Sequence, residues 1–306
     1  MSEHLTHIAI YDDTYRLVLH ADGFHEAFRT SLQNHPDVGL LCSGSRGNHL
    51  FAIPFLEETR DQWSSRKDGD GVEEKIAAAI GWLSHRAIDL QVKPMYLKID
   101  EIEEARYSET ENEIYHDAVT FDKVYQRGRD ASVSPKVHLS EAILADHMQG
   151  HPAASLLYVA QVEPMMCAMV QQNLVSLNQF NATAKSPDEW LDKFPDHYQK
   201  LGENLETYIE AFQRPDPVKM EKYIHSVNYY NEKDELIRLA RELQHKGKSS
   251  ISLDDALAKA DDQSHYAQGL RRSVQFIRSA NAFFEKKMDK DTAYDQVEIF
   301  DEAHRI

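Results

Sequence analysis

The segment "GVEEKIAAAIGWLSHRAIDLQV" (residues 71–92) constrains the fold more than any other part of the chain. Its apolar side chains recur with helical spacing, and the strongest stripe contains Ile76, Ile80, Leu83 and Leu90. Further apolar residues occupy the opposite side, so this helix is apolar nearly all round. A helix of that kind has to be buried, and we therefore expect it at the centre of a helical protein.

Helical periodicity also dominates elsewhere, over 4–20, 22–33 and 109–126. Asn231 and Ser252 are expected N-caps of later helices, and Gly247 is an expected helix stop. The one strand-like run that we find, "HLFAIPF", is short and contains a proline. The pattern predicts an all-α, multi-helix bundle.

The length of 306 residues suits one large domain or two ordinary ones. Because the breaks between helical segments are short, we predict a single all-α domain over 1–306. In this prediction 1–126 supply the helices of the candidate metal site, and 127–306 supply additional packing helices.

Composition limits the partners and the compartment. The formal net charge of −17 disfavours binding to a nucleic-acid duplex or to an anionic membrane. The two cysteines, Cys42 and Cys167, lie among apolar neighbours, so we expect free thiols rather than a disulfide framework. We find neither a signal peptide nor a transmembrane segment and expect a cytoplasmic protein. A homodimer is left open.

His85 and Asp89 are polar residues on the apolar central helix, and their presence there needs a physical reason. They lie one turn apart and therefore on the same face. A buried carboxylate without donors or a cation costs several kcal/mol, or roughly 3–5 kcal/mol when its partner is removed. Either an internal His85–Asp89 contact, supported by Arg86 or by a backbone group, satisfies the carboxylate, or a metal ion does.

Further polar residues fall on other expected helices. His7 lies on the mostly apolar face of the first helix, where a core histidine and a metal ligand are both plausible interpretations. Glu113 and His116 share a stripe at the i, i+3 spacing of carboxylate-bridged metal bundles, although a solvated polar face would give the same pattern. Asp117 lies nearer the apolar side of that helix.

Two loop-like segments are candidates for binding a substrate. The glycine-rich run "CSGSRGNHLF" ends in Asn48 and His49, and loops of this kind allow close backbone approach to a ligand. The segment "SVNYYNEKD" contains Asn228 and Tyr229 ahead of an expected helix, where it would line a pocket or form an ordinary turn.

Three segments follow one another in the order "THIAI", the glycine-rich run and "GWLSHRAID…KP". In the order of these segments the chain resembles the zinc-dependent phospholipase C family, which is distantly related to the fungal single-strand zinc nucleases. The resemblance implies a phospholipase C-like helical bundle in which several side chains hold a zinc cluster. It matches His7, His85 and Asp89 to metal ligands and makes His116 the counterpart of a late histidine ligand. Asn48 stands where the family has an aspartate.

The resemblance covers residues 1–125, and this chain departs from the family pattern at several ligand positions. Besides Asn48, Thr120 stands where a glutamate ligand is expected. We therefore expect one or two ions, Zn²⁺ or another divalent metal, rather than a three-zinc cluster.

The resemblance implies a phospholipase C-like, divalent-metal-dependent hydrolase that acts on a small-molecule or phosphate-ester substrate. Asp117, Glu113 or Asp12 would serve as the base or would orient the ligands. One alternative is an HD-type phosphohydrolase that uses His116 and Asp117 as its His-Asp doublet. The other is a non-catalytic helical binding protein with a degenerate metal site.

Overall fold

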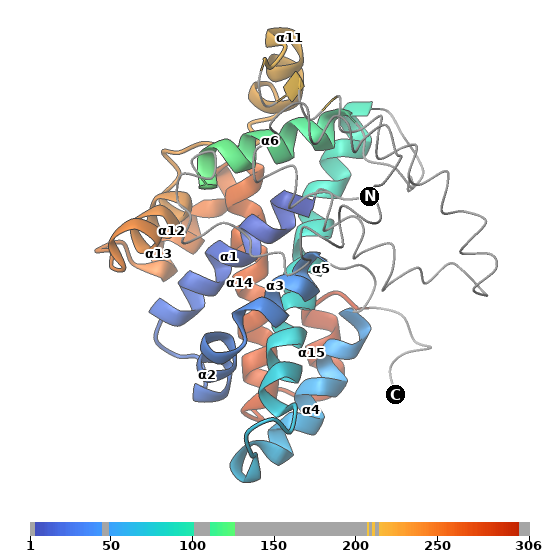
Figure 1. Cartoon of the computed structure of the whole chain (residues 1–306), viewed down its shortest axis with the longest axis vertical. Coiled ribbons are helices and arrows are strands. Elements are labelled where there is room, and N and C mark those ends of the chain that lie inside the picture. The colour runs from blue at the N-terminus through green and yellow to red at the C-terminus, as the bar shows by residue number, and fades with distance from the viewer. Residues whose placement is uncertain are drawn as a thin grey trace, which may run out of the picture. The chain divides into compact units, whose positions relative to one another are not determined.

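The computed structural model describes residues 4–44, 49–100, 111–125, 207, 210–211 and 214–299. Every regular element in this part of the chain is a helix, which confirms the all-α class (Figure 1). The elements are α1 (His4–His20), α2 (Glu26–Asn34), α3 (Pro36–Gly44), η1 (His49–Phe51), α4 (Ala52–Gln62), η2 (Trp63–Ser65), α5 (Val72–Asp100), α6 (Glu111–Tyr125), α11 (Pro217–Met220), η4 (Glu221–His225), α12 (Glu235–Lys246), α13 (Leu253–Lys259), η5 (Ala260–Asp262), α14 (His265–Phe284) and α15 (Lys290–Gln296).

Periodicity located the early helices well. Helix α1 has the predicted bounds, and α6 begins and ends within two residues of the prediction. Helix α5 is longer than expected, because it continues through Pro94 to Asp100. Pro94 lies on the exposed side of the helix, whereas Met95 and Tyr96 beyond it are buried, so packing outweighs the backbone hydrogen bond that proline removes.

Three local expectations can be compared with the structure. Ser252 caps α13 by accepting a hydrogen bond from the Asp255 N–H, as predicted. Gly247 ends α12 with a φ of 67°, also as predicted. The Asn231 cap is wrong: its side chain accepts from the Lys233 N–H in a preceding turn, and α12 begins after Asp234. The strand-like run 49–55 forms η1 and the start of α4.

The chain divides into two compact units, 1–9 with 95–229 and 10–94 with 230–306. Helices α1 and α5 each continue across the division. Each unit combines early and late segments of the chain. The expected division of roles at residue 126 therefore does not coincide with the boundary between the two units. The single domain stays a prediction.

The described part of the first unit is organised around α6. This helix packs against α11 and η4, and the Tyr223 hydroxyl of η4 donates to Glu111 at 2.7 Å. All of 112–118 on α6 are buried, together with Thr120 and Phe121. The solvated polar face that was one interpretation of the Glu113 and His116 stripe is therefore wrong.

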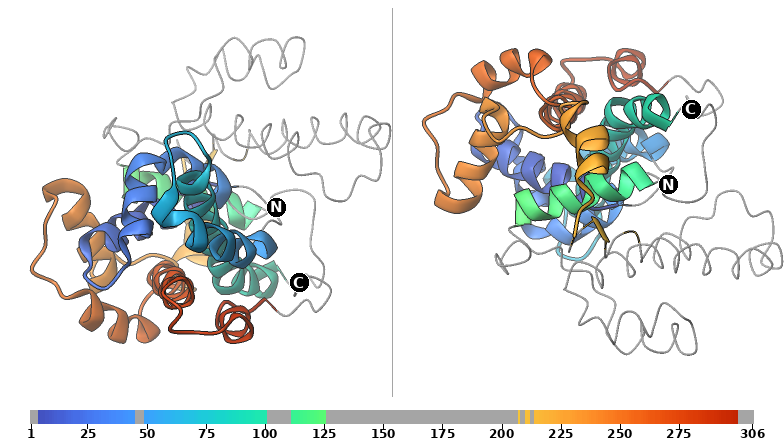
Figure 2. Two further views of the ribbon diagram at one scale, coloured as in Figure 1. Left: turned by 90° about the horizontal axis from the view of Figure 1, so that it is seen from below. Right: turned by 90° about the horizontal axis from the view of Figure 1, so that it is seen from above.

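In the second unit, α14 contacts α4, α12 and α15. It stands upright in Figure 1 and is seen end-on in Figure 2. Ser264 caps its N-terminus, and the carboxylate of buried Asp234 accepts both the N–H and the hydroxyl of Ser264. Asp234 thus anchors the start of α14 instead of capping α12 through its own side chain.

A fully buried carboxylate joins three helices of this unit. Asp13 of α1 accepts a hydrogen bond from the Tyr266 hydroxyl of α14 at 2.9 Å. It also forms ion pairs with Arg241 of α12 and, at 3.2 Å, with Arg16 of its own helix. These donors compensate for the loss of water around a charge that would be costly to bury alone.

Two glycines allow α3 and α5 to touch. A Cβ atom at Gly81 would collide with the Gly39 carbonyl oxygen and would lie 2.9 Å from the Cys42 Cβ. A Cβ at Gly39 would in turn lie 2.6 Å from Cζ of Tyr11 on α1. The three helices therefore approach one another at a point where only glycine fits. Cys42 is buried here beside Trp82, and this burial raises the pKa of the Cys42 thiol to about 12.

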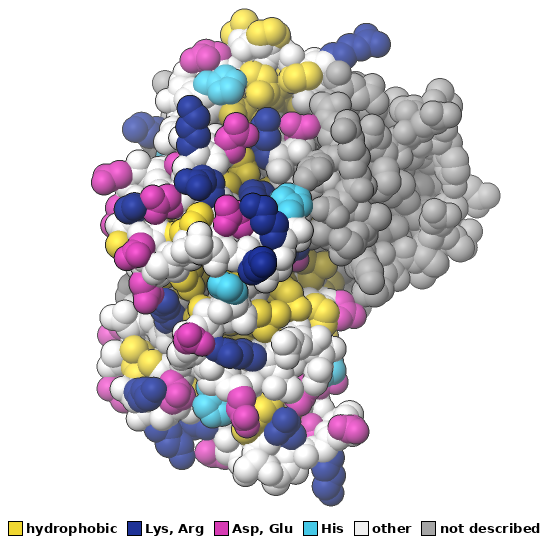
Figure 3. Space-filling view, turned by 90° about the vertical axis from the view of Figure 1, so that its left-hand side faces the viewer, with side chains coloured by type: hydrophobic (Ala, Val, Ile, Leu, Met, Phe, Trp, Pro, Cys, Tyr) yellow, Lys and Arg dark blue, Asp and Glu magenta, His cyan; other side chains and the backbone are white. Residues whose placement is uncertain are grey.

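No helix in the described ranges is both long enough and apolar enough to cross a bilayer. On the face drawn in Figure 3, acidic and basic side chains are interspersed, and no large area of one sign stands out.

Replacing Gly81 with alanine should destabilise the protein by about 1–3 kcal/mol, because the new methyl group meets backbone that cannot rotate away. Thermal unfolding measures the effect, and the melting temperature should fall by roughly 2–4 °C per kcal/mol.

Gly269→Ala is the matched control, since it makes the same change inside α14. There the new Cβ meets only the terminal methyl group of the Ile10 side chain, whose Cδ1 lies 3.1 Å away and has to shift by only a few tenths of an ångström. Alanine also has the higher helix propensity, so this variant should melt at or above the wild-type temperature. Equal losses in the two variants would contradict the packing argument.

Candidate metal site

His85 is buried on α5, and its ring has one unambiguous partner. The Nδ1 atom lies 2.7 Å from the backbone oxygen of Ser43 at the end of α3. A carbonyl oxygen only accepts hydrogen bonds, so Nδ1 has to carry the proton. The neutral ring therefore has its lone pair on Nε2.

That lone pair faces a carboxylate. Nε2 of His85 lies 3.3 Å from Oδ2 of Asp89, one helical turn further along α5. Two acceptors in contact repel each other, so the pair needs either a second proton on the imidazole or a cation shared by both atoms. A histidine that donates Nδ1–H to a backbone carbonyl and points Nε2 outward is the common arrangement of a metal ligand.

The spacing is compatible with both solutions. The observed distance of 3.3 Å is within ion-pair range, and two atoms that each lie about 2.0–2.1 Å from a tetrahedral ion are also separated by about 3.3 Å. One expectation has to be corrected, because Asp89 is not fully buried: about a quarter of its side chain, 26%, is exposed. Asp89 is thus the more exposed of the two residues, since only 6% of the His85 side chain is exposed.

His7 adds a third donor. His7, His85 and Asp89 each offer one ligand atom, and these atoms all lie within 4.8 Å of one another. His7 is buried and precedes Tyr11 by one turn on the continuous helix α1. Nitrogen and carboxylate donors in this combination suit Zn²⁺ and related divalent ions.

Two further side chains contribute to the electrostatics around His85 and Asp89. Burial lowers the pKa of His49 to about 4, and the charge of Arg86 acts in the same direction, whereas Asp89 opposes it. His49 is therefore neutral at pH 7. Burial also lowers the pKa of Arg86, which Asp89 and Glu298 oppose, and its guanidinium donates to the Glu298 backbone oxygen at 2.9 Å. Arg86 remains a cation near the carboxylate of Asp89.

The predicted residues of α6 form a different set of contacts. Nε2 of His116 lies 2.6 Å from the backbone oxygen of Tyr223, and the fully buried ring lies against Tyr96 and Tyr229. Glu113 is buried on the same helix. The cluster that contains His7, His85 and Asp89 includes neither residue. The roles of His116 as a metal ligand and of Glu113 as a catalytic base stay predictions.

Asp117 has a structural task. Its carboxylate accepts the backbone N–H groups of Leu5 and Thr6 at 3.2 and 2.8 Å and the Thr6 hydroxyl at 3.0 Å. These amides belong to the first turn of α1, which has no intrahelical partners for them, and a negative charge is favourable there. The contacts favour helix capping over catalysis.

The remaining candidates are scattered. Tyr229 is fully buried, with its hydroxyl bonded to Thr6 and Thr120 at 2.9 and 2.7 Å, and Asn228 occupies a turn with a φ of 49°. Asp12 pairs with Arg16 at 2.7 Å, and burial raises the pKa of Asp12. Asn48 and Cys167 lie outside the described residues.

Sequence reasoning missed the backbone oxygen of Ser43, which fixes the tautomer of His85. A backbone partner on another helix leaves no side-chain signature. Gly81 was the available signal, because it stands four residues before His85 and so marks the face of α5 that touches another helix.

Comparisons with protein-family models, with curated proteins and with solved structures gave no match to this chain. The resemblance to the zinc-dependent phospholipases C therefore stays a prediction.

Asp117→Asn should lower the free energy of unfolding by about 1–3 kcal/mol, because an amide group turns N–H donors toward the amides of α1. Chemical denaturation measures this loss. Asp122→Asn, on the partly exposed side of α6 next to Lys123, is the matched control and should cost less than about 1 kcal/mol. A stable Asp117→Asn protein would remove the capping role.

Proposed function

We propose that the chain is a divalent-metal-dependent hydrolase of phosphate esters, with His7, His85 and Asp89 as the ligands of Zn²⁺ or a similar ion. The observation that supports this most strongly is the His85 ring, whose Nδ1–H is committed to Ser43 while Nε2 faces Asp89. The reaction class rests on the resemblance to the zinc-dependent phospholipases C. One or two ions and a cytoplasmic location belong to the same proposal.

The bound ion would supply a water molecule of lowered pKa for attack on phosphorus. The chain's own residues have separate tasks. Ser43 holds the His85 ring in one tautomer, and the partly exposed side of Asp89 gives access from solvent. Arg86 places a positive charge near Asp89, which would favour an anionic phosphate ester. His49 is neutral at pH 7, and its pKa of about 4 makes it a weak base there.

The two alternatives differ in what they require. An HD-type phosphohydrolase needs His116 and Asp117 at a metal. Both side chains instead contact backbone groups, His116 at the Tyr223 oxygen and Asp117 at the N–H groups of Leu5 and Thr6. A non-catalytic helical binding protein needs only that a protonated His85 forms an ion pair with Asp89. The metal content of the protein and the response of its stability to chelator discriminate between the His85–Asp89 ion pair and the metal site.

Chelation should lower the melting temperature of the wild-type protein. A ligand present at a hundredfold excess over its Kd stabilises the folded state by about 2.7 kcal/mol, which corresponds to a shift of several degrees at roughly 2–4 °C per kcal/mol. Asp89→Asn should bind less metal, should lose most of the response to chelator and should not hydrolyse bis-p-nitrophenyl phosphate, because an amide is a poor ligand for a cation.

Asp61→Asn is the matched control, since this carboxylate is 69% exposed and makes only long surface ion pairs. It should keep the wild-type metal content, chelator response and activity. If the wild-type protein contains no metal and chelator leaves its melting temperature unchanged, His85 and Asp89 are an ion pair and the binding-protein alternative is favoured.

A further inference from the structure

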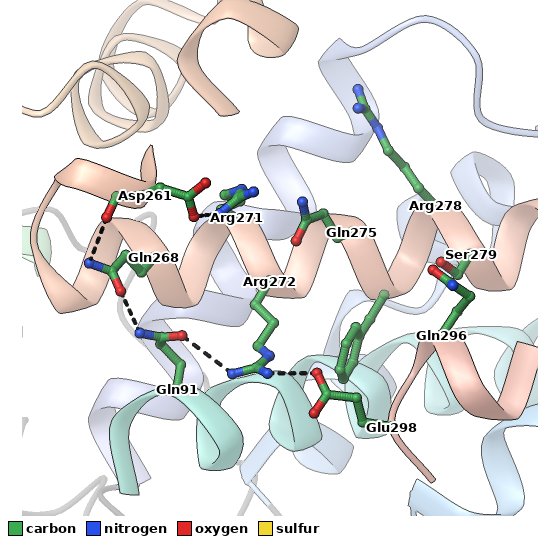
Figure 4. Close-up of a pocket in the computed structure, with 11 residues that line it drawn as sticks. Gln91, Asp261, Gln268, Arg271, Arg272, Gln275, Arg278, Ser279, Gln296 and Glu298 are labelled. Carbon is green, nitrogen blue, oxygen red and sulfur yellow. Dashed lines mark hydrogen bonds and ion pairs between the residues drawn. The ribbon is translucent and has the colours of Figure 1, made fainter. Parts of the chain in front are cut away.

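A polar groove along α14 lies within the second unit. It encloses about 560 Å³, which is within the usual size of a small-molecule site. Its lining includes three arginines and two carboxylates, and each of the three arginines forms an ion pair with a carboxylate of the same unit. Figure 4 shows the side chains that α14 presents to it.

Arg271, Gln275 and Arg278 follow one face of α14 at spacings of four and three residues. The two arginines pair with Asp261 and Asp254, whose side chains are 64% and 78% exposed. Exposed ion pairs contribute little to stability, so either guanidinium can turn to a ligand at small cost.

Arg272 has a different role. It donates to the Leu90 backbone oxygen at 3.1 Å and to the Glu298 carboxylate at 2.6 Å, and Gln91 lies beside it (Figure 4). Glu298 adopts a φ of 55°, a conformation that favours glycine. Holding Arg272 in place is thus a reason for a glutamate at this position, and Arg272 forms a fixed wall of the groove.

Gln275, Ser279 and Gln296 also line the groove and carry hydrogen-bonding groups. Amide and hydroxyl side chains both donate and accept, which suits the hydroxyl groups of a polyol. Guanidinium groups suit phosphate, with which they form paired, charge-assisted hydrogen bonds.

We propose that this groove binds a small phosphorylated polyol, with Arg271 and Arg278 on the phosphate and Gln275, Ser279 and Gln296 on the hydroxyl groups. The inference does not rest on the proposed metal site, because none of the three metal ligands lines the groove.

Calorimetric titration tests this with glucose 6-phosphate, glucose and inorganic phosphate as probes. We expect saturable binding of glucose 6-phosphate, with glucose and inorganic phosphate each at least tenfold weaker. Absence of saturation by glucose 6-phosphate up to about 10 mM would overturn the proposal. Equal binding of inorganic phosphate would overturn the assignment of a polyol.

Gln275→Glu is the decisive variant, since it keeps the side-chain size and places a negative charge between the two arginines. Binding of glucose 6-phosphate should weaken at least tenfold. Gln33→Glu, which makes the same change at an exposed position of α2, should bind as the wild type does. Unchanged affinity in Gln275→Glu would contradict the proposal, and thermal melts verify that both variants are folded.

Asp89→Asn separates this site from the metal site, where a phosphate ester could also bind. The variant should retain the affinity for glucose 6-phosphate, as should chelator-treated wild-type protein. If Asp89→Asn abolishes binding and Gln275→Glu does not, the phosphate binds at the metal site and the groove proposal fails.

Discussion

The contact between Gly39 and Gly81 is the constraint on which the candidate site depends. It brings the backbones of α3 and α5 together, and no larger residue fits at either position. One turn further along each helix, Ser43 and His85 make their 2.7 Å hydrogen bond. The same close approach that packs the core therefore fixes the ring of His85, and a change at Gly81 should disturb both.

Three aspartates illustrate how the protein accommodates negative charge. Asp13 is surrounded by Arg16, Arg241 and Tyr266, and Asp117 accepts the first amides of α1. Each of these carboxylates faces groups that carry hydrogens. Asp89 faces Nε2 of His85 at 3.3 Å, and Arg86 adds a positive charge near it. The proposed metal site therefore differs from the other two aspartates in having a histidine ring nitrogen beside the carboxylate.

The sequence predicted the helices better than the contacts between them. Stripes of apolar residues located α1 and α6, and the i, i+4 spacing placed His85 and Asp89 on one face of α5. It could not predict that α5 continues beyond Pro94, because burial of Met95 and Tyr96 is a tertiary effect. Nor could the sequence predict the hydrogen bond from His85 Nδ1 to the Ser43 backbone oxygen on α3.

The α14 groove was equally hidden, for a related reason. Its lining comes from Gln91 on α5, from Asp261 and α14, and from the end of α15. Arginines and glutamines on an exposed helical face are ordinary in a sequence. Only the fold shows that they surround one cavity, and only the backbone angle of Glu298 draws attention to its ion pair with Arg272.

The protonation of the His85 ring tests the central claim most directly. Nitrogen-15 NMR of the histidine rings, with His85 assigned among 16 histidines by comparison with His85→Gln, reports each ring nitrogen separately. The account predicts a protonated Nδ1 throughout and an Nε2 resonance that shifts when one equivalent of Zn²⁺ is added to chelator-treated protein. An imidazole with both nitrogens protonated at pH 7 and no response to Zn²⁺ would contradict it.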